Sequence, residues 1–129
     1  MTLKTILAAA AVSLAAIPSV SAKDVTYKVV SPDGHLSATV VVGNSITYSV
    51  SKDAVNLIDA SEISMTLSDG VVFGDNDKVR KVKKASVDQT LPTVAYKKAQ
   101  VRDNYNEITL IFKEFSLAFR AYDEGVAYR

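Results

Sequence analysis

Turn-forming residues divide the sequence from residue 23 onward into short extended segments, and this spacing restricts the fold more than any other feature. The clearest turn clusters are Pro32-Asp33-Gly34, Gly43-Asn44, Asp69-Gly70 and Asp123-Glu124-Gly125. Proline presets the first backbone angle of a turn, and glycine tolerates the positive φ that many turns need. The segments between the turns alternate apolar and polar residues, as Ser45 to Ser51 does, and none shows sustained helical periodicity. The pattern predicts an all-β sandwich or barrel, and we favour an antiparallel β-sandwich.

The first 22 residues have the pattern of a secretory signal peptide. Lys4 supplies a positive start, Ile6 to Ile17 is an apolar run, and Val20-Ser21-Ala22 has the small residues of a cleavage site. The apolar run is shorter than the roughly 20 residues that cross a bilayer. We therefore expect cleavage before Lys23, a mature domain over 23–129, and a periplasmic or secreted protein with no membrane segment after cleavage.

The composition excludes several classes of protein. There is no cysteine, so neither a disulfide framework nor lipid attachment at a cysteine is available. The chain has 15 Lys plus Arg and 14 Asp plus Glu, and removal of Lys4 leaves equal numbers. This balance gives no electrostatic reason to expect nucleic acid or an anionic membrane as a partner.

One local stretch is strongly basic. Lys78 to Lys84 reads Lys-Val-Arg-Lys-Val-Lys-Lys, and from Lys78 to Arg102 eight basic residues stand against the single acid Asp88. A nucleic-acid patch would have aromatic residues interleaved with the charges, and none occurs before Tyr96. We interpret the run as a water-facing edge strand, where lysines prevent pairing with other sheets.

Two later segments predict a specific strand register. The segments Val101 to Phe112 and Phe115 to Tyr122 pair in an antiparallel register that puts Ile108, Leu110 and Phe112 opposite Phe119, Leu117 and Phe115. A slip by one residue would send this apolar row to the wrong side of the sheet. The same register predicts a cross-strand ion pair between Glu107 and Arg120, partly shielded by Tyr105 and Tyr122. The connection at Lys113-Glu114 is either a two-residue turn or a four-residue loop.

The last predicted hairpin comes directly after these segments in the sequence. We expect a three-residue loop at Asp123, Glu124 and Gly125, with the glycine in the left-handed conformation. Both faces of the hairpin are largely apolar or aromatic, so we expect it inside a stack of sheets. The returning strand stops after four residues, at Arg129. We therefore expect the domain to be incomplete at its C-terminus.

No residue pattern predicts a catalytic residue, a cofactor-binding residue or a metal ligand. His35 has no second histidine or cysteine with which to form a zinc site or a Cys-His pair. Asp75-Asn76-Asp77 lacks the glycine and the distant glutamate of a calcium loop, and we interpret it as a solvated turn. Asp123 and Glu124 point apart on a tight turn, unlike the carboxyl groups of a glycosidase. The six tyrosines are Tyr27, Tyr48, Tyr96, Tyr105, Tyr122 and Tyr128, and their spacing does not separate sugar platforms from core packing.

Three blocks of the sequence resemble a known enzyme family. They are Phe119 to Arg129, Val101 to Ile108, and Val30 to Gly34 together with Ser45 to Val50. Their order and spacing are similar, over nearly all of the mature chain, to the N-terminal domain of glycoside hydrolase family 97. The last block alone is less specific, because other α-glycosidase families carry a similar Arg-x-Tyr-x-x-Gly-Val-Ala-Tyr-Arg.

The resemblance implies a galactose-mutarotase-like β-supersandwich that packs against a catalytic (β/α)₈ barrel in an exported α-glucosidase or α-galactosidase. The barrel of the same polypeptide is then the partner, and α-linked glycans are the substrates of the complete enzyme. The family's catalytic residues and calcium ligands belong to segments that follow Arg129. The resemblance thus implies a non-catalytic, carbohydrate-binding-like portion, about half of the N-terminal domain, inactive alone and without a cofactor of its own.

Two alternatives follow from the strand pattern without the resemblance. One is a stand-alone exported module for carbohydrate binding or adhesion, with an immunoglobulin-like sandwich. The other is a small periplasmic barrel that binds an apolar ligand in a cavity lined by Val, Ile and Phe.

Overall fold

The computed structural model describes residues 24–94, 97 and 99–129, and this part of the chain is built from strands without a helix. The strands are β1 Val25–Val30, β2 Leu36–Val42, β3 Ile46–Lys52, β4 Val55–Ile63, β5 Met65–Thr66, β6 Val72–Phe73, β7 Lys81–Pro92, β8 Gln100–Ile111, β9 Ser116–Tyr122 and β10 Val126–Tyr128. All pairings between them are antiparallel. The predicted all-β antiparallel fold is confirmed.

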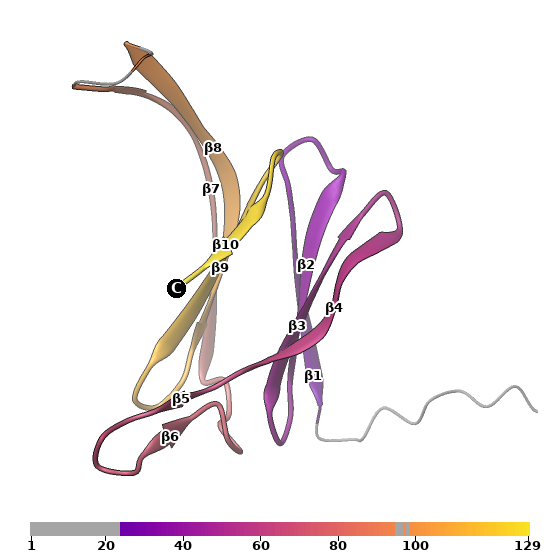
Figure 1. Cartoon of the computed structure of the whole chain (residues 1–129), viewed down its shortest axis with the longest axis vertical. Coiled ribbons are helices and arrows are strands. Elements are labelled where there is room, and N and C mark those ends of the chain that lie inside the picture. The colour runs from indigo at the N-terminus through magenta and orange to yellow at the C-terminus, as the bar shows by residue number, and fades with distance from the viewer. Residues whose placement is uncertain (1–23, 95–96, 98) are drawn as a thin grey trace, which may run out of the picture.

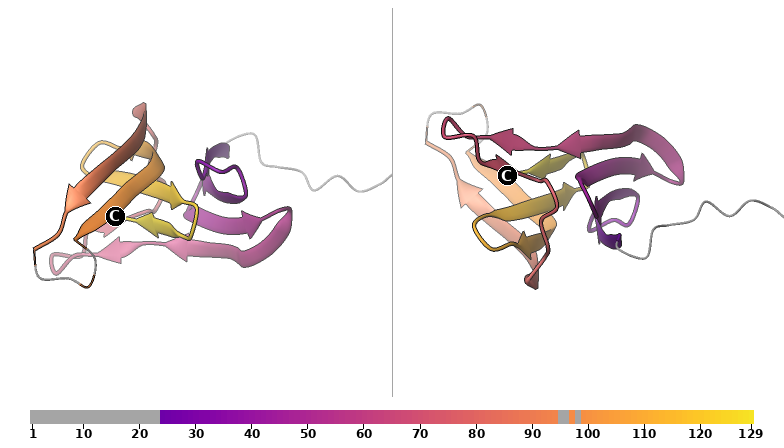
Figure 2. Two further views of the ribbon diagram at one scale, coloured as in Figure 1. Left: turned by 90° about the horizontal axis from the view of Figure 1, so that it is seen from above. Right: turned by 90° about the horizontal axis from the view of Figure 1, so that it is seen from below.

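Two four-stranded sheets form the two layers of a sandwich, as Figures 1 and 2 show. The first sheet has the order β1-β2-β3-β4, and the second has the order β10-β9-β8-β7. Strands that are consecutive in the sequence are neighbours in both sheets, so each sheet is a meander. The small β5–β6 hairpin lies on the path from one sheet to the other.

The core lies between the two sheets and draws on both. Its buried residues are Val29, Ala38, Val40, Val42 and Ile46 from the first half of the chain, and Ile108, Leu110, Phe112, Leu117, Phe119 and Ala121 from the second. Strand β1 packs on β8 and β9, and β2 packs on β9 and β10. This stacking leaves β4 and β7 at opposite sides of the sandwich, where both strands are largely exposed.

The predicted register of β8 and β9 is confirmed. Ile108 lies opposite Phe119 and Leu110 opposite Leu117, and all four side chains are buried. Four residues separate the assigned strands, and the Phe112 N–H donates to the Phe115 carbonyl at 2.9 Å. The connection is therefore tight and preserves the register.

The final hairpin differs from the prediction at its turn. The Tyr122 N–H donates to the Gly125 carbonyl at 2.8 Å, which leaves only Asp123 and Glu124 inside the turn. Gly125 is not among the residues with positive φ, so the expected left-handed glycine is wrong. Strand β9 is mostly buried, but β10 is an edge strand with exposed residues. Only half of the hairpin lies inside the stack.

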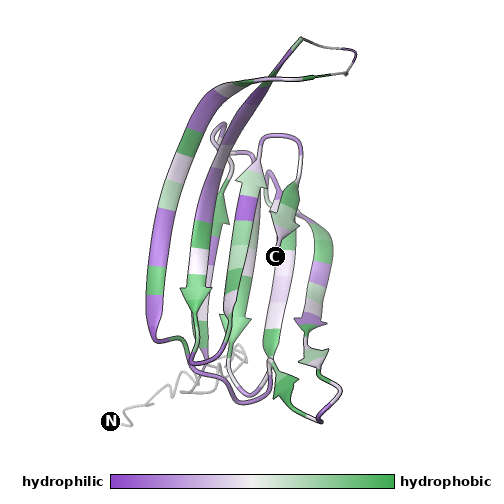
Figure 3. Ribbon diagram, turned by 90° about the vertical axis from the view of Figure 1, so that its left-hand side faces the viewer, coloured by the Kyte–Doolittle hydropathy of each residue, from purple (hydrophilic) through white to green (hydrophobic). Residues whose placement is uncertain are grey.

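The second part of the basic run, from Lys81 to Lys84, lies in an edge strand as predicted, whereas Lys78 to Arg80 precede it. Strand β7 begins at Lys81, pairs only with β8 inside its sheet, and has almost all of its residues exposed. The β7–β8 hairpin extends past the end of the sandwich (Figures 1 and 3). Figure 3 shows hydrophilic residues interspersed with hydrophobic ones along this hairpin, as expected where water reaches both faces.

Candidate functional site

The outer face of the second sheet carries the ion pair that the sequence predicts. Glu107 on β8 lies directly opposite Arg120 on β9, and the Arg120 Nε donates to the Glu107 Oε2 at 2.6 Å. The Glu107 side chain is 16% exposed and the Arg120 side chain is 30% exposed. The structure therefore brings the two predicted residues together in a half-shielded setting.

Two tyrosines on the same face provide the shielding. The Arg120 guanidinium lies 4.3 Å from the centroid of the Tyr105 ring, a distance at which a cation is attracted to the face of an aromatic ring. Tyr105 and Tyr122 lie opposite each other with their ring centroids 5.1 Å apart. The rings keep water from one side of the pair, and this strengthens its electrostatic attraction.

The charge of Glu107 is held by its neighbours. The hydrogen bond from Arg120 is the largest cause that lowers the pKa of Glu107, and Arg120 and Arg129 add electrostatic attraction. The Thr109 hydroxyl also donates to Glu107, at 3.4 Å. In turn, Glu107 raises the pKa of Arg120. The pair is thus fully charged and mutually neutralised near neutral pH.

A polar contact that the sequence reasoning missed joins the two sheets. The Asn106 side-chain amide on β8 donates to the Val30 carbonyl at 2.8 Å, and the Ser86 hydroxyl donates to the Asn106 Oδ1 at 2.7 Å. The signal was an asparagine on the inward face, two residues before buried Ile108. This contact fixes the distance between β1 and β8 at one end of the core.

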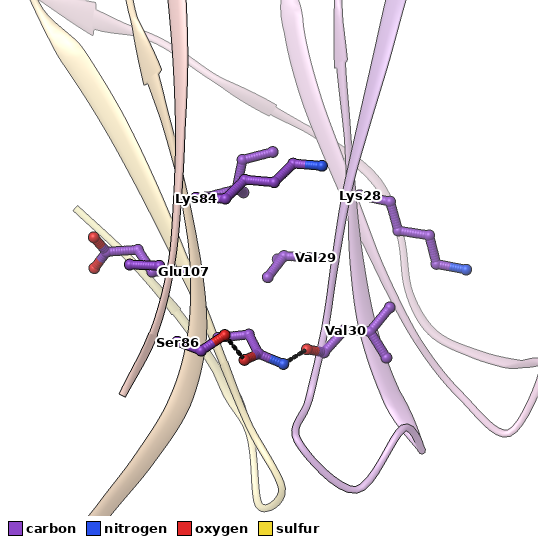
Figure 4. A pocket seen from close by; sticks show the side chains of 9 residues that line it. Lys28, Val29, Val30, Lys84, Ser86 and Glu107 are labelled. Atoms are coloured by element: carbon purple, nitrogen blue, oxygen red, sulfur yellow. Dashed lines mark hydrogen bonds between the residues drawn. The ribbon is translucent and has the colours of Figure 1, made fainter. Parts of the chain in front are cut away.

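The same region contains a shallow groove of about 330 Å³. Figure 4 shows Val29 and Lys84 pointing into the space between the sheets, whereas Lys28 and Glu107 point away from it. The ion pair and the groove are therefore separate features on opposite faces of β8.

The loops at one end of the sandwich form a second link between the sheets. The Asp33 N–H donates to the Asp123 Oδ1 at 2.9 Å, across 90 residues of sequence. His35 makes a contact that the sequence does not predict: its Nδ1 lies 2.6 Å from the Asp53 Oδ1. This contact raises the pKa of His35. Sequence reasoning missed it because Asp53 comes beside His35 only through the β3–β4 turn.

The Asp75-Asn76-Asp77 segment, predicted as a turn, bends at Asn76, where φ is 53°, and Asp75 forms an isolated antiparallel bridge with Ser45. The Gly74 N–H donates to the Asp77 Oδ2 at 2.7 Å, and the Asn76 N–H donates to the Asn44 carbonyl at 2.8 Å. Within the described residues, no group of three or more His, Cys, Asp or Glu side chains is placed to hold a metal ion.

The carboxyl groups with clearly shifted pKa values all shift downward in the described residues. The Ser31 hydroxyl and the His35 N–H lower the pKa of Asp33, and Arg102 lowers the pKa of Asp88. Glu107 follows the same direction. A glycosidase general acid needs a raised pKa so that it keeps its proton near neutral pH, and these three carboxyl groups have the opposite property.

One tyrosine borders an apolar groove. Tyr128 on β10 is 50% exposed and makes tilted ring contacts with Tyr48 and Phe119, with ring centroids 5.4 Å away in both cases. It lines a groove of about 420 Å³ that also contains Met65 and Phe73. Tyr105, in contrast, is buried, and Tyr96 lies outside the described residues.

Residues 29–129 match the family model described as glycosyl-hydrolase 97 N-terminal. The chain belongs to this family. Over 104 residues, this family 97 chain is 38% identical to a retaining alpha-galactosidase of Bacteroides thetaiotaomicron, an alignment that covers 80% of the chain and 16% of the relative. The chain thus spans about one sixth of that enzyme's length.

Solved structures show the same fold in this family. A family 97 enzyme from Pseudoalteromonas sp. strain K8, solved with panose and with acarbose, matches with a TM-score of 0.72 and 24% identity over 79% of the chain and 17% of the enzyme. A beta-arabinopyranosidase matches with a TM-score of 0.70, also at 24% identity.

The part of the chain that the structure describes contains no apolar helix of membrane-spanning length.

Proposed function

We propose that this chain is the non-catalytic N-terminal β-sandwich portion of an exported α-glycosidase, which supports a catalytic (β/α)₈ barrel belonging to the same enzyme. The observation that carries the proposal is the family match over residues 29–129, in a chain that spans 16% of the matched α-galactosidase. The bond cleavage itself is assigned to the barrel.

The chemistry of the described carboxyl groups supports a structural role. Hydrolysis of a glycosidic bond uses one protonated and one ionised carboxyl group that converge on the same bond. Glu107 is committed to Arg120, Asp88 to Arg102, and Asp123 to the Asp33 N–H. Each of these groups contributes to holding strands or loops together.

The substrates of the complete enzyme are α-linked glycans under this proposal. They are α-glucosides or α-galactosides, and a retaining alpha-galactosidase is among the proteins that this chain resembles. The calcium ion that the family resemblance implies is assigned to ligands outside this chain. Export is supported by the charged start, apolar run and small residues of positions 1–22.

The proposal is tested on the purified chain with aryl α-galactoside and aryl α-glucoside substrates. We expect no release of the aryl group above the buffer rate, and we expect the periplasmic or secreted form to have the mass of a chain that begins near Lys23. Turnover that the substitution Glu107→Gln or Asp123→Asn abolishes would overturn the non-catalytic assignment. A full-length cytoplasmic product would overturn the export assignment.

A second candidate, a glycan-binding module, is favoured by one observation. Tyr128 is half exposed beside an apolar groove, and sugar rings stack on exposed aromatic faces. The same preparations therefore are titrated with oligosaccharides by calorimetry. Binding heat that the unmodified chain shows, that Tyr128→Ala loses and that Tyr27→Ala retains would support direct glycan binding by this portion. If neither the unmodified chain nor the variants show binding heat, only the supporting role remains.

A further inference from the structure

Three turns that are far apart in the sequence lie at one end of the sandwich. They are the β1–β2 turn, the β3–β4 turn and the β9–β10 turn, and Figure 1 shows them at the same end of the molecule. The Asp33 N–H of the first turn donates to the Asp123 Oδ1 of the third at 2.9 Å. The Asp53 N–H of the second turn donates to the His35 carbonyl at 2.9 Å. Both of the other turns are therefore attached to the β1–β2 turn.

The side chain of Asp33 orders the β1–β2 turn. Its Oδ1 accepts hydrogen bonds from the Ser31 hydroxyl at 2.5 Å and from the His35 N–H at 3.0 Å. Ser31 is 2% exposed, and its hydroxyl oxygen accepts a hydrogen bond from the Leu36 N–H at 2.9 Å. The backbone that carries the His35 imidazole is thus held in place by contacts on both sides of it.

The β3–β4 turn has a backbone conformation that is uncommon for its residues. The φ angle is 48° at Asp53 and 65° at Ala54, in the left-handed region that residues other than glycine seldom adopt. Such a conformation persists where surrounding contacts impose it. Two contacts with His35 do this, because its carbonyl accepts the Asp53 N–H and its Nδ1 lies 2.6 Å from the Asp53 Oδ1.

One of these two contacts depends on pH. His35 is the single histidine of the chain, and a histidine side chain changes its charge between about pH 5 and 8. The hydrogen bond with Asp53 is the largest cause that raises the pKa of His35, and the charges of Asp53 and Asp33 act in the same direction. Lys52 acts against them. The imidazole therefore holds its proton more strongly in the folded chain.

The charged groups near the imidazole come from several elements. They are Asp33 in its own turn, Asp53 in the β3–β4 turn, Lys52 at the end of β3, Lys28 on β1, which lines the same shallow groove as His35, and Asp123 in the β9–β10 turn, which contacts Asp33. The carboxylates outnumber the lysines in this group. The surroundings of the ring thus favour its charged form.

We infer that His35 is a pH-sensitive latch, which holds the β3–β4 turn against the β1–β2 turn through its contact with Asp53. The protonated imidazole places a positive charge against the carboxylate and keeps the left-handed turn closed. The neutral imidazole retains only a hydrogen bond, so the turn opens more often. The inference is independent of the proposed function, because it uses contacts made within this chain.

The direction of the pH dependence follows from linkage. The pKa of His35 is raised above its ordinary value of 6.5, so the folded state binds the proton more strongly than the unfolded state does. The stabilisation is therefore present below the ordinary pKa and is lost as the pH rises through the raised pKa. The two side chains are 58% and 59% exposed for His35 and Asp53. The effect is accordingly expected in the turn itself more than in the stability of the whole domain.

Proton NMR titration of the purified chain tests the latch first. The single histidine gives one imidazole signal to follow, and we expect its midpoint above about 6.5 in the unmodified chain and near that value in Asp53→Asn. Asparagine tolerates the left-handed conformation, so this variant removes the charge and leaves the turn allowed. The matched control is Asp75→Asn, which removes the same charge beside Ser45 in the β2–β3 turn and should leave the midpoint unchanged. Equal midpoints in the unmodified chain and Asp53→Asn would overturn the latch.

Amide exchange with solvent, measured by NMR, follows the turn directly. After correction for the intrinsic pH dependence of exchange, we expect the Asp53 N–H to be protected several-fold more at about pH 5.5 than at about pH 8. The Gly43 N–H, which donates to the Ser45 carbonyl in the β2–β3 turn, serves as the internal control and should show no such change.

The variant His35→Gln completes the test, because glutamine can form a hydrogen bond but does not change its charge in this pH range. We expect the protection of the Asp53 N–H to be independent of pH in this variant. Protection that does not change with pH in the unmodified chain, or that changes equally in His35→Gln, would overturn the latch. Far-ultraviolet circular dichroism verifies that each variant folds. If Asp53→Asn does not fold, the comparison of the unmodified chain with His35→Gln decides alone.

Discussion

At the scale of single residues, the Glu107–Arg120 pair shows how a charge contact contributes to stability on a sheet surface. Exposed ion pairs contribute about 1 kcal/mol or less, and removal of one partner of a buried pair costs about 3 to 5 kcal/mol. With side chains 16% and 30% exposed, this pair lies between the two limits. The Tyr105 ring adds a second contact that only the arginine makes.

Arg120→Ala is therefore expected to lower the free energy of unfolding by about 1 to 3 kcal/mol. The substitution leaves the Glu107 carboxylate without its main partner and removes the contact with Tyr105. Urea denaturation followed by tyrosine fluorescence measures the change. The matched control is Arg102→Ala, which breaks an ion pair with Asp88 whose side chains are both more than half exposed, and which we expect to change stability little. Equal effects of the two substitutions would contradict the shielding of the Arg120 pair.

The same pair predicts a pH dependence. Arg120 lowers the pKa of Glu107 from its ordinary value of 4.5, so the folded state holds the ionised form more strongly than the unfolded state does. The stabilisation is therefore complete above about pH 5 and is lost as the pH falls through the lowered pKa. The stability difference between the unmodified chain and Glu107→Gln should be constant from pH 6 to 7.5 and should narrow below pH 4.5. A difference that grows on acidification would show the opposite sign.

At the scale of elements, the sequence predicts the conformation of some turns correctly and of others incorrectly. Gly34 has a φ of 81° in the β1–β2 turn, whereas Gly125 has no positive φ in the β9–β10 turn. Sequence reasoning treated both as turn glycines. The β3–β4 turn instead has positive φ at Asp53 and Ala54, a pair without the Asn-Gly signal of such a turn.

Gly34→Ala is accordingly expected to cost about 1 kcal/mol, because a side chain disfavours the left-handed region. Gly125→Ala should be nearly neutral, since no heavy atom lies within 4 Å of its added Cβ and its φ is not positive. Thermal melting of the two variants makes the comparison. A larger loss for Gly125→Ala than for Gly34→Ala would mean that the final turn does need its glycine.

A strand can be predicted from the sequence when its apolar and polar residues alternate regularly. The β8–β9 register was readable because only one alignment buries Ile108, Leu110, Leu117 and Phe119 together. Strand β4 was not readable over its whole length, because an exposed edge strand with register shifts imposes no alternation on its residues.

The contacts of the candidate site are likewise predictable only where the strand pattern determines them. The Glu107–Arg120 contact lies between adjacent strands, so the register alone places the two residues opposite each other. The Asn106–Val30 and Asp33–Asp123 contacts depend on how one sheet stacks on the other. Stacking is set by the whole core rather than by any local pattern, and sequence reasoning had no signal for it beyond a polar residue at an inward position.

At the scale of the whole molecule, the sandwich is held by one core and by two long-range polar contacts near the same end. The Asn106 amide joins β8 to β1, and Asp123 joins the β9–β10 turn to the β1–β2 turn. The core and these two contacts together hold the sheets against each other.

The meander order of the two sheets has a consequence for how the chain tolerates interruption. Each large sheet uses consecutive strands, and the described chain passes between the sheets once, by way of β5 and β6. A cut or an inserted domain at the exposed Asp69-Gly70 turn would therefore break no ladder of either large sheet. We expect the two halves, made as separate fragments, to reassemble through their shared apolar faces, which makes this turn the natural position at which to split the protein.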